Sequence, residues 1–432
     1  MKLGIGKAII TPPLGTPLCG FVREQGAQGV LDDLEVRVFW LQDGDSAADA
    51  VCIVSADLIG FCGDTADILR AAIAETCGVL PDRILLAASH THSGPQVGTS
   101  LITVGDSVPE VADEILRLIL EAAKQAQSEL HPVTLHGGKG FLKGYAINRR
   151  GIENGESDLK PNPEGPRDDE VTVLSFRDKS SGNLRAILFH FTCHACVLNG
   201  LNVSADYPGA TRRFIENESG ERIVAGFLPG CCGNIDPFCT YIGGEYSRAG
   251  LPRDVELFGA ALGREVMRVA RESSRELTPC LAGRMVTLDL PFQRFPSREE
   301  LEHTRDRQDE EFVSQWNAEY QRTWAVHMLA MPEFHSKPLM LQRIDLARDA
   351  TLVAMSGEVC VEYGLYIKSL HPDSFMIPMG YSNGLIGYIP TAAMLDEGGY
   401  EPVRSGMYYG FPSPLKPEVE EIVREGIRSI LE

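Results

Sequence analysis

Two histidines, His90 and His92, stand one residue apart in the segment Ser89 to Pro95. This segment comes directly after the apolar run Ile84 to Ala88. An apolar run that ends abruptly in polar residues, Gly and Pro is typical of a buried strand that opens into a loop. Ligands bind at the carboxyl ends of such strands in α/β sheets. The pair predicts one metal ligand and one proton-handling neighbour, and two loop histidines bonded to backbone are an equally good interpretation.

A second group of candidates follows the apolar run near residue 190. His194 lies at the end of that run and is the better ligand candidate, whereas His190 stands between two phenylalanines and is expected to be a core residue. Cys193 and Cys196 form a C-x-x-C pair, a spacing used in zinc and redox sites. No second C-x-x-C follows, so buried structural thiols are the preferred interpretation. A redox protein built on this pair remains an alternative.

Oxygen donors occur in three later segments. Asp236 lies in the Gly-rich turn 230–237, Glu358 follows the apolar run 351–355, and Tyr388 lies in a segment rich in Gly and Tyr. A glutamate at a strand-to-helix switch can bind a metal or simply lie in the first turn of a helix. Two histidines, a glutamate and a tyrosine would make a site with an open position, suited to Zn²⁺ and water activation. It is one of several assemblies that the spacing allows.

These candidates require strands and helices that bring them together. Short apolar runs predict strands, and periodic apolar residues predict helices between some of them. The predicted strands are 34–41, 51–55, 84–88, 171–176, 186–191 and 223–228, and the predicted helices are 64–76, 109–127, 211–216, 255–273 and 417–431. This alternation indicates an α/β protein with a mixed β-sheet core and flanking helices.

Two stretches lack a strong apolar pattern. Residues 149–169 hold Gly, Pro, Asn and charges, and are predicted to form a long loop near a site. Residues 296–322 are dense in Glu, Arg and Gln, and are predicted to form a solvated helix. No linker or shift in composition divides the chain, so we expect residues 1–432 to form one catalytic domain.

The overall charge excludes two classes of partner. The 432 residues hold 60 acidic and 40 basic side chains, a formal net charge of −20. Nucleic acids and anionic membrane surfaces both require a basic footprint, so neither is expected as the main partner. No run approaches the ~18 apolar residues of a membrane span, and the first residues lack a secretory signal. With an odd count of 11 cysteines, this favours reduced thiols and a cytoplasmic protein.

As a set, these segments resemble the catalytic domain of the neutral ceramidase family. Residues 89–95 are similar to the family's T-H-T-H-S-G-P, which is the most specific match. The other matches follow in the family's order and span residues 3 to about 401. They are the first strand at 3–13, N-R at Asn148-Arg149, F-x-x-H at 191–194, P-G-E at 356–358, S-N-x-Y-x-x-Y-x-T-T at 382–391 and Y-E at Tyr400-Glu401.

This resemblance implies a zinc amidohydrolase that cleaves an N-acyl bond. The family pattern assigns zinc ligation to four residues, His90, His194, Glu358 and Tyr388. It places His92 beside the substrate as the proton-handling residue. Arg149 and Tyr400 would stabilise the developing oxyanion or hold the polar head of the substrate.

The chain also departs from the family pattern. Asp236 stands where the family's G-D-x-S-P has its serine, which argues against a covalent serine mechanism and makes Asp236 a second acid/base candidate. The sequence given has neither the family's immunoglobulin-like domain nor its secretion signal. We therefore expect an amidase acting on a small or medium N-acyl compound rather than ceramide itself. An ester or lactone hydrolase and a non-catalytic metal- or ligand-binding protein remain alternatives.

Overall fold

The computed structural model describes residues 1–99, 101–102, 105–220, 223–242, 249–307 and 318–432. Within these ranges a nine-stranded mixed sheet runs in the order β12-β10-β9-β6-β1-β3-β4-β5, with β14 paired to β6. Only the pairs β10–β12 and β4–β5 are parallel. The strands are β1 Lys2–Ile9, β3 Glu35–Gln42, β4 Val51–Ala56, β5 Ile84–Ala88, β6 His131–Phe141, β9 Glu170–Asp178, β10 Leu184–Phe191, β12 Val224–Pro229 and β14 Ser274–Leu277.

Helices cover one face of this sheet. They are α1 Thr65–Cys77, α2 Pro109–Ser128, α3 Asp206–Glu218 and α4 Pro252–Glu272. Alternation along β3 shows the two faces, because Val38 and Trp40 pack in the cluster that contains α2, whereas Phe39 packs on the opposite side. At Gly4 an added Cβ would lie 1.7 Å from the Ala126 carbonyl oxygen. A glycine is therefore required there for α2 to lie directly on β1.

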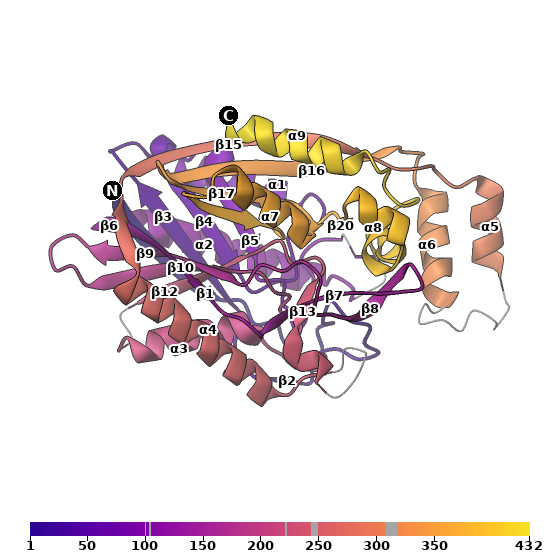
Figure 1. The fold of residues 1–432 in the computed structure, drawn as a ribbon, viewed down its shortest axis with the longest axis horizontal. Helices are drawn as coiled ribbons and strands as arrows, with labels where there is room; N and C mark the ends of the chain where they lie inside the picture. The colour runs from indigo at the N-terminus through magenta and orange to yellow at the C-terminus, as the bar shows by residue number, and fades with distance from the viewer. Residues whose placement is uncertain (100, 103–104, 221–222, 243–248, 308–317) are drawn as a thin grey trace.

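A second sheet covers the opposite face, as Figure 1 shows, with α9 lying over it. Its order is β15-β16-β17-β19. The elements are β15 Pro279–Pro291, β16 Ser336–Ala347, β17 Ala350–Met355, β19 Phe375–Met379, α7 Val361–Leu370 and α9 Val419–Leu431. The predicted α/β class with a mixed sheet and flanking helices is confirmed, and buried apolar runs form most strands of the large sheet.

The prediction of a long loop at 149–169 is wrong. Residues Ala146–Glu153 form β7 and Glu156–Asn162 form β8, an antiparallel hairpin. Its turn is Asn154-Gly155, with φ of 53° and 86°, and two positive φ values are what a tight primed turn needs. The strands were missed because the hairpin is largely polar, although residues 146–150 of β7 are buried. The Asn-Gly pair was the available signal.

The prediction of a single helix at 296–322 is also wrong. Helix α5, Arg298–Asp306, ends at the extended residue Arg307, and α6 begins separately at Ala318–Ala330. Residues 308–317 of the predicted helix lie outside the described residues. The two helices form a lobe at one end of the molecule (Figure 1) around the buried side chains of Leu301 and Trp324. This lobe therefore has a small core of its own.

Short elements complete the region where the candidate residues gather. They are β2 Gly29–Val30, β11 Asn202–Val203, β13 Ile235–Pro237, β18 Glu358–Val359, β20 Tyr388–Ile389, α8 Ala392–Glu397, the π-helical turn η4 Tyr400–Arg404 and the 3-10 turn η5 Ser405–Tyr409. In the parts of the chain that the structure describes, every helix is too short or too polar to cross a bilayer.

Candidate active site

His90 and His194 are held in the same way. His90 follows β5 and His194 follows β10, and both are buried. Nδ1 of His90 lies 2.6 Å from the Ile59 carbonyl oxygen, and Nδ1 of His194 lies 3.1 Å from the Ile235 carbonyl oxygen. A ring that donates from Nδ1 to a carbonyl keeps the lone pair on Nε2, which is the arrangement of metal-binding histidines.

Both Nε2 atoms face one carboxylate oxygen. Oε2 of Glu358 lies 3.3 Å from Nε2 of His90 and 3.2 Å from Nε2 of His194. Burial acts to raise the pKa of Glu358, but the two histidines outweigh it and hold that pKa well below its usual value. Burial lowers the pKa of His90, whereas Cys232 and Glu358 overcome the effect of burial at His194 and raise its pKa to about 10. At neutral pH the raised pKa leaves a proton on Nε2 of His194, facing Glu358. A metal ion bound here would displace that proton and take up the Nε2 lone pair.

The ring of His92 lies beside this pair. Both of its ring nitrogens are buried and unpaired within the described part of the chain. Packing holds the ring instead, because Phe21 meets it edge-on at 4.8 Å and an added Cβ on Gly20 would lie 2.6 Å from its Cγ. Arg23 donates to the His92 carbonyl oxygen at 2.7 Å. Burial and the neighbouring His90 lower the pKa of His92 well below its usual value, so its ring is neutral at pH 7.

The three histidines form one buried group. One ligand atom from each of His90, His92 and His194 lies within 4.8 Å of the others. Three imidazoles with an adjacent carboxylate match the nitrogen and oxygen donors that Zn²⁺ prefers. The unpaired nitrogens of His92 are unusual for buried polar atoms and fit a site that takes a further group.

Glu358 is anchored by neighbours on both sides. It pairs with Tyr388 in the parallel register of β18 and β20, so their side chains stand together. Its second oxygen, Oε1, accepts a hydrogen bond from the hydroxyl of Tyr409. Tyr409 was not predicted, because it lies on the short turn η5 with no spacing that links it to the other residues. Tyr381, also missed, lies with its ring 4.1 Å from that of His90.

A network of charged side chains lies next to the histidines. Arg149, on β7, donates from Nε to Glu401 and from Nη1 to Asp236, at 2.9 Å each. Its Nη2 donates to the Gly233 carbonyl oxygen at 2.7 Å and to the Tyr388 hydroxyl at 3.0 Å. Burial opposes the charged form, but Asp236 leads the groups that raise the pKa of Arg149 well above its usual value. The sequence identified Arg149 and Asp236 separately but not the ion pair between them.

Glu401 and Tyr400 complete this network. Oε2 of Glu401 accepts from Nη1 of Arg150 at 2.7 Å, so one carboxylate binds two neighbouring arginines. The Arg149 guanidinium lies 5.5 Å from the ring centroid of Tyr400, whose ring also meets that of Tyr388. Burial raises the pKa of Tyr400. The side chains of this network therefore come from three distant parts of the chain.

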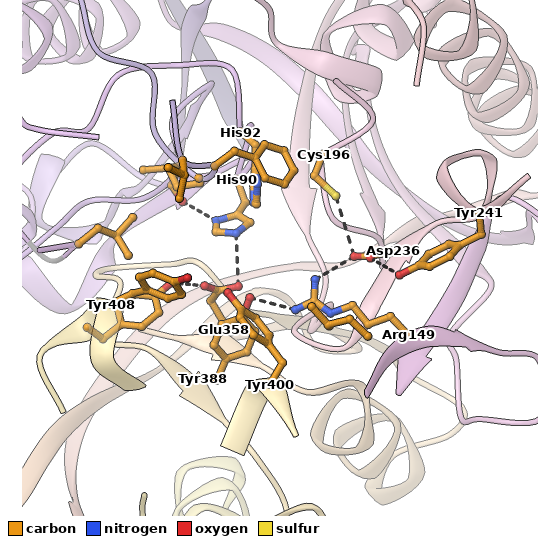
Figure 2. A pocket seen from close by; sticks show the side chains of 17 residues that line it. His90, His92, Arg149, Cys196, Asp236, Tyr241, Glu358, Tyr388, Tyr400 and Tyr408 are labelled. Carbon is orange, nitrogen blue, oxygen red and sulfur yellow. Dashed lines mark hydrogen bonds and ion pairs between the residues drawn. The ribbon is translucent and has the colours of Figure 1, made fainter. Parts of the chain in front are cut away.

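These groups surround a cavity of about 240 Å³, shown in Figure 2. Arg149, Asp236, Tyr241 and Cys196 lie on one side of Glu358, and Tyr408 lies on the other. Seven of the eight predicted site residues line the cavity, and the eighth, His194, contacts two of them, His90 and Glu358. The lining residues are Gly20, Phe21, Val22, Ile59, His90, His92, Leu101, Arg149, Leu159, Cys196, Asp236, Tyr241, Glu358, Tyr388, Tyr400, Tyr408 and Tyr409.

Comparison with known proteins identifies the family. Residues 1–245, more than half of the chain, match the model of the neutral/alkaline non-lysosomal ceramidase, N-terminal family. The chain belongs to this family. Among curated proteins it is 27% identical over 248 residues to the neutral ceramidase of Pseudomonas aeruginosa. The sequence match covers 55% of this chain and 37% of the relative, well under half of that ceramidase's length.

Solved structures extend the likeness in fold beyond the matched half. The crystal structure of neutral ceramidase from Pseudomonas aeruginosa has a TM-score of 0.75 at 19% identity, covering 99% of this chain and 73% of that one. A ceramidase complexed with C2 has the same TM-score at 17% identity, covering 99% and 74%. The neutral ceramidase fold thus includes the second sheet and the segments that carry Glu358, Tyr388 and Tyr400, and the resemblance predicted from the sequence is confirmed.

The C-x-x-C pair and His190 lie near this ceramidase-family site, and their predicted roles can be compared with the structure. Cys193 and Cys196 are free buried thiols, and burial raises the pKa of both well above its usual value, which disfavours the reactive thiolate. Their burial agrees with the structural role preferred from the sequence, although Cys196 also lines the cavity. His190 is buried with Nε2 2.9 Å from the Pro378 carbonyl oxygen, so its expected place in the core is confirmed.

Proposed function

We propose that this chain is a zinc-dependent amidohydrolase that cleaves the N-acyl bond of a small or medium N-acyl compound. Membership of the neutral ceramidase family supports an amidase-type hydrolase. The observation that carries the proposal is the pairing of His90 and His194, each with Nδ1 at a carbonyl oxygen and Nε2 facing the same oxygen of Glu358. This arrangement leaves buried nitrogen and oxygen donors turned toward a cavity.

His90, His194 and Glu358, with Tyr388, are the residues that would hold the metal. Bound Zn²⁺ would lower the pKa of a water molecule to about 7 and polarise the acyl carbonyl. Tyr388 stands beside Glu358, and its hydroxyl already accepts from Arg149. His92 is close enough to be a further nitrogen ligand, and we assign it instead to proton transfer.

His92 performs the acid/base work in this proposal. Its neutral, unpaired ring can take a proton from the attacking water and later deliver one to the departing nitrogen. The C–O bond to the acyl carbon then forms as the C–N bond breaks, giving a carboxylic acid and an amine. Arg149 and Tyr400 line the cavity and would stabilise the negative charge that develops on the acyl oxygen.

The size of the cavity supports a small substrate. Its volume of about 240 Å³ lies below the ~300–1,000 Å³ typical of sites that enclose drug-sized ligands. Apolar side chains line part of it, Phe21, Val22 and Leu101 among them, and these suit a short acyl group. A two-chain lipid would have to leave most of its length outside.

The test combines metal analysis with matched substrates. Purified protein is expected to hold about one equivalent of zinc, to lose activity on chelation and to regain it with Zn²⁺. Short-chain ceramide, simple N-acyl amines and the corresponding esters are compared at equal acyl length. Faster turnover of amides supports the amidase, and turnover of esters alone replaces it with an esterase. Full activity of the metal-depleted protein contradicts the proposal.

The role of His92 has its own readout. His92→Ala is expected to keep the zinc and to lose at least ~100-fold in kcat, because general acid/base catalysis contributes that much. Loss of zinc from His92→Ala would instead make His92 a ligand.

A further inference from the structure

One wall of the cavity carries a carboxylate, that of Asp236, to which the proposed mechanism gives no role, although its Oδ1 lies 4.0 Å from Nδ1 of His194. Asp236 lies on β13, which pairs with β7 so that Asp236 stands opposite Ile147. Its side chain is buried, 5% exposed, and still lines the cavity together with Tyr241 and Cys196 (Figure 2). A buried carboxylate that reaches a substrate cavity is a candidate for recognising part of the substrate.

Arg149 on the same wall is already engaged. Four of its hydrogen bonds go to protein groups, and two of the acceptors are the carboxylates of Asp236 and Glu401. A guanidinium has five N–H donors and one positive charge. With two carboxylates bound to it, Arg149 offers little net positive charge to a substrate carboxylate, and beyond these four bonds one of its five N–H donors remains for the acyl oxygen.

Asp236, by contrast, keeps capacity to accept. An ionised carboxylate accepts through about four lone-pair positions and donates nothing. Its Oδ1 accepts from Arg149 at 2.9 Å, and its Oδ2 accepts from the Tyr241 hydroxyl at 2.8 Å. The Cys196 thiol, 3.9 Å from Oδ1, is a weak third donor. Because the Tyr241 hydroxyl donates its hydrogen bond to Asp236, the phenol oxygen is left as another acceptor.

This wall of the cavity is therefore rich in acceptors and poor in donors. The apolar side chains of Phe21, Val22 and Leu101 line the same cavity, with Phe21 against the ring of His92, and they suit the acyl group. The departing amine of an N-acyl substrate would then lie toward Asp236. A group bound there must bring a hydrogen-bond donor, since a substrate carboxylate would meet the Asp236 carboxylate at close range.

We propose that Asp236 is a specificity-determining residue that selects N-acyl substrates whose amine portion carries a hydroxyl or ammonium donor and rejects those whose amine portion carries a carboxylate. This inference rests on the amidohydrolase function proposed above. It assigns a role to the residue at which the chain departs from the serine of the family pattern. Catalysis itself is left to His92 and the metal ligands.

The experiment compares four amides with one acyl group. N-acyl ethanolamine carries a hydroxyl, N-acyl ethylenediamine an ammonium, N-acyl propylamine no donor and N-acyl glycine a carboxylate. We expect the wild type to favour the first two over the propylamide by at least ~10-fold in kcat/KM, with the glycine compound last, because a buried polar group rejects a substrate that leaves it unpaired.

Asp236→Asn is the decisive variant. Its amide oxygen can still accept from Arg149, so the ion-pair partner is kept in place while the charge is removed. The preference for the hydroxyl and ammonium compounds should fall ~10-fold through KM, the propylamide should change less than ~2-fold, and the glycine compound should improve. Asp236→Ser, which introduces the residue of the family pattern, should shift the ranking in the same direction.

The outcomes separate the two proposals. Equal losses on all four amides in Asp236→Asn, with an unchanged ranking, would make Asp236 a merely structural residue and overturn the inference. Turnover of none of them by the zinc-loaded wild type would count against the amidohydrolase function instead. In that case calorimetric binding of the same four compounds still tests Asp236, and equal affinities for all four overturn its selective role. Asp168→Asn, a buried ion-pair variant outside the cavity, controls for general loss of stability.

Discussion

The two walls of the cavity are held together by different forces. On the histidine wall, backbone carbonyl oxygens hold the rings of His90 and His194, which follow strands β5 and β10 of the large sheet. On the charged wall, Arg149, Asp236 and Glu401 hold one another through side-chain ion pairs across 87 and 252 positions of the sequence.

Because of this difference, substitutions on the two walls are expected to affect different properties, catalysis on one and stability on the other. A ring held by a carbonyl can be removed with little damage beyond the ring itself, because the backbone remains in its sheet. A buried arginine cannot be removed in the same way, because its carboxylate partners are left as uncompensated charges. We therefore expect changes on the histidine wall to affect metal and catalysis first, and changes on the charged wall to affect folding first.

The largest effect is expected from His90→Asn. His90 has φ of 60°, and asparagine tolerates this left-handed conformation better than most residues. The variant should fold, lose bound zinc and lose at least ~100-fold in activity, measured by elemental analysis and amide turnover. The matched control is His190→Gln, a core histidine of β10, which should keep its zinc. Normal zinc in His90→Asn would contradict the metal assignment.

Arg149→Met removes the guanidinium that binds Asp236 and Glu401 on the charged wall. Leaving Asp236 and Glu401 without this partner should lower the free energy of unfolding by ~3–5 kcal/mol, measured by urea denaturation. Arg117→Met removes an exposed ion pair with Glu114, in which the side chains are 56% and 54% exposed, and is the control. It should cost no more than ~1 kcal/mol. Equal costs in the two variants would show that the buried pairs add no stability to this wall.

Gly20→Ala tests whether the position of the His92 ring matters for catalysis. Gly20 has φ of 96°, and its added Cβ would lie 2.6 Å from Cγ of His92, so the ring must move. We expect kcat to fall ~10–100-fold, as for displacements of about 1 Å at a reacting group, with zinc content unchanged. Gly15→Ala has a similar φ of 89° with nothing within 4 Å. If both variants lose the same activity, backbone strain rather than contact with His92 is the cause.

The smallest effect is expected from His190, which lies on β10, the strand that precedes His194, and does not line the cavity. Burial, aided by Lys368, lowers its pKa to about 4, whereas an unfolded histidine titrates near its usual pKa of 6.5. The stability contributed by neutral His190 is therefore present above pH 6.5 and is lost as the pH falls toward 4. Between pH 6 and pH 5 the wild type should lose about 1 kcal/mol relative to His190→Gln, measured by urea denaturation at each pH. Parallel pH curves for the two proteins would contradict this pKa shift.

Most of the large sheet could be predicted because its strands are buried on both faces. The predicted strand 84–88 agrees residue for residue with β5, since nothing but apolar side chains fits between helices and second sheet. The β7–β8 hairpin could not be found from apolar content, because its strands are largely polar. Arg149 was nevertheless identified through the family pattern, without the strand that carries it.

The sequence by itself determined that the three histidines stand at the ends of buried strands. His90, His92 and His194 each follow an apolar run, and a buried strand must deliver its next residues to the edge of the sheet. Only the tertiary structure decided the charged wall and the surroundings of each ring. Ion pairs such as Arg149–Asp236 join residues far apart in sequence, and so do the contacts of Tyr409 with Glu358 and of Gly20 with His92. No local pattern records such pairs, because they depend on how separate elements pack against one another.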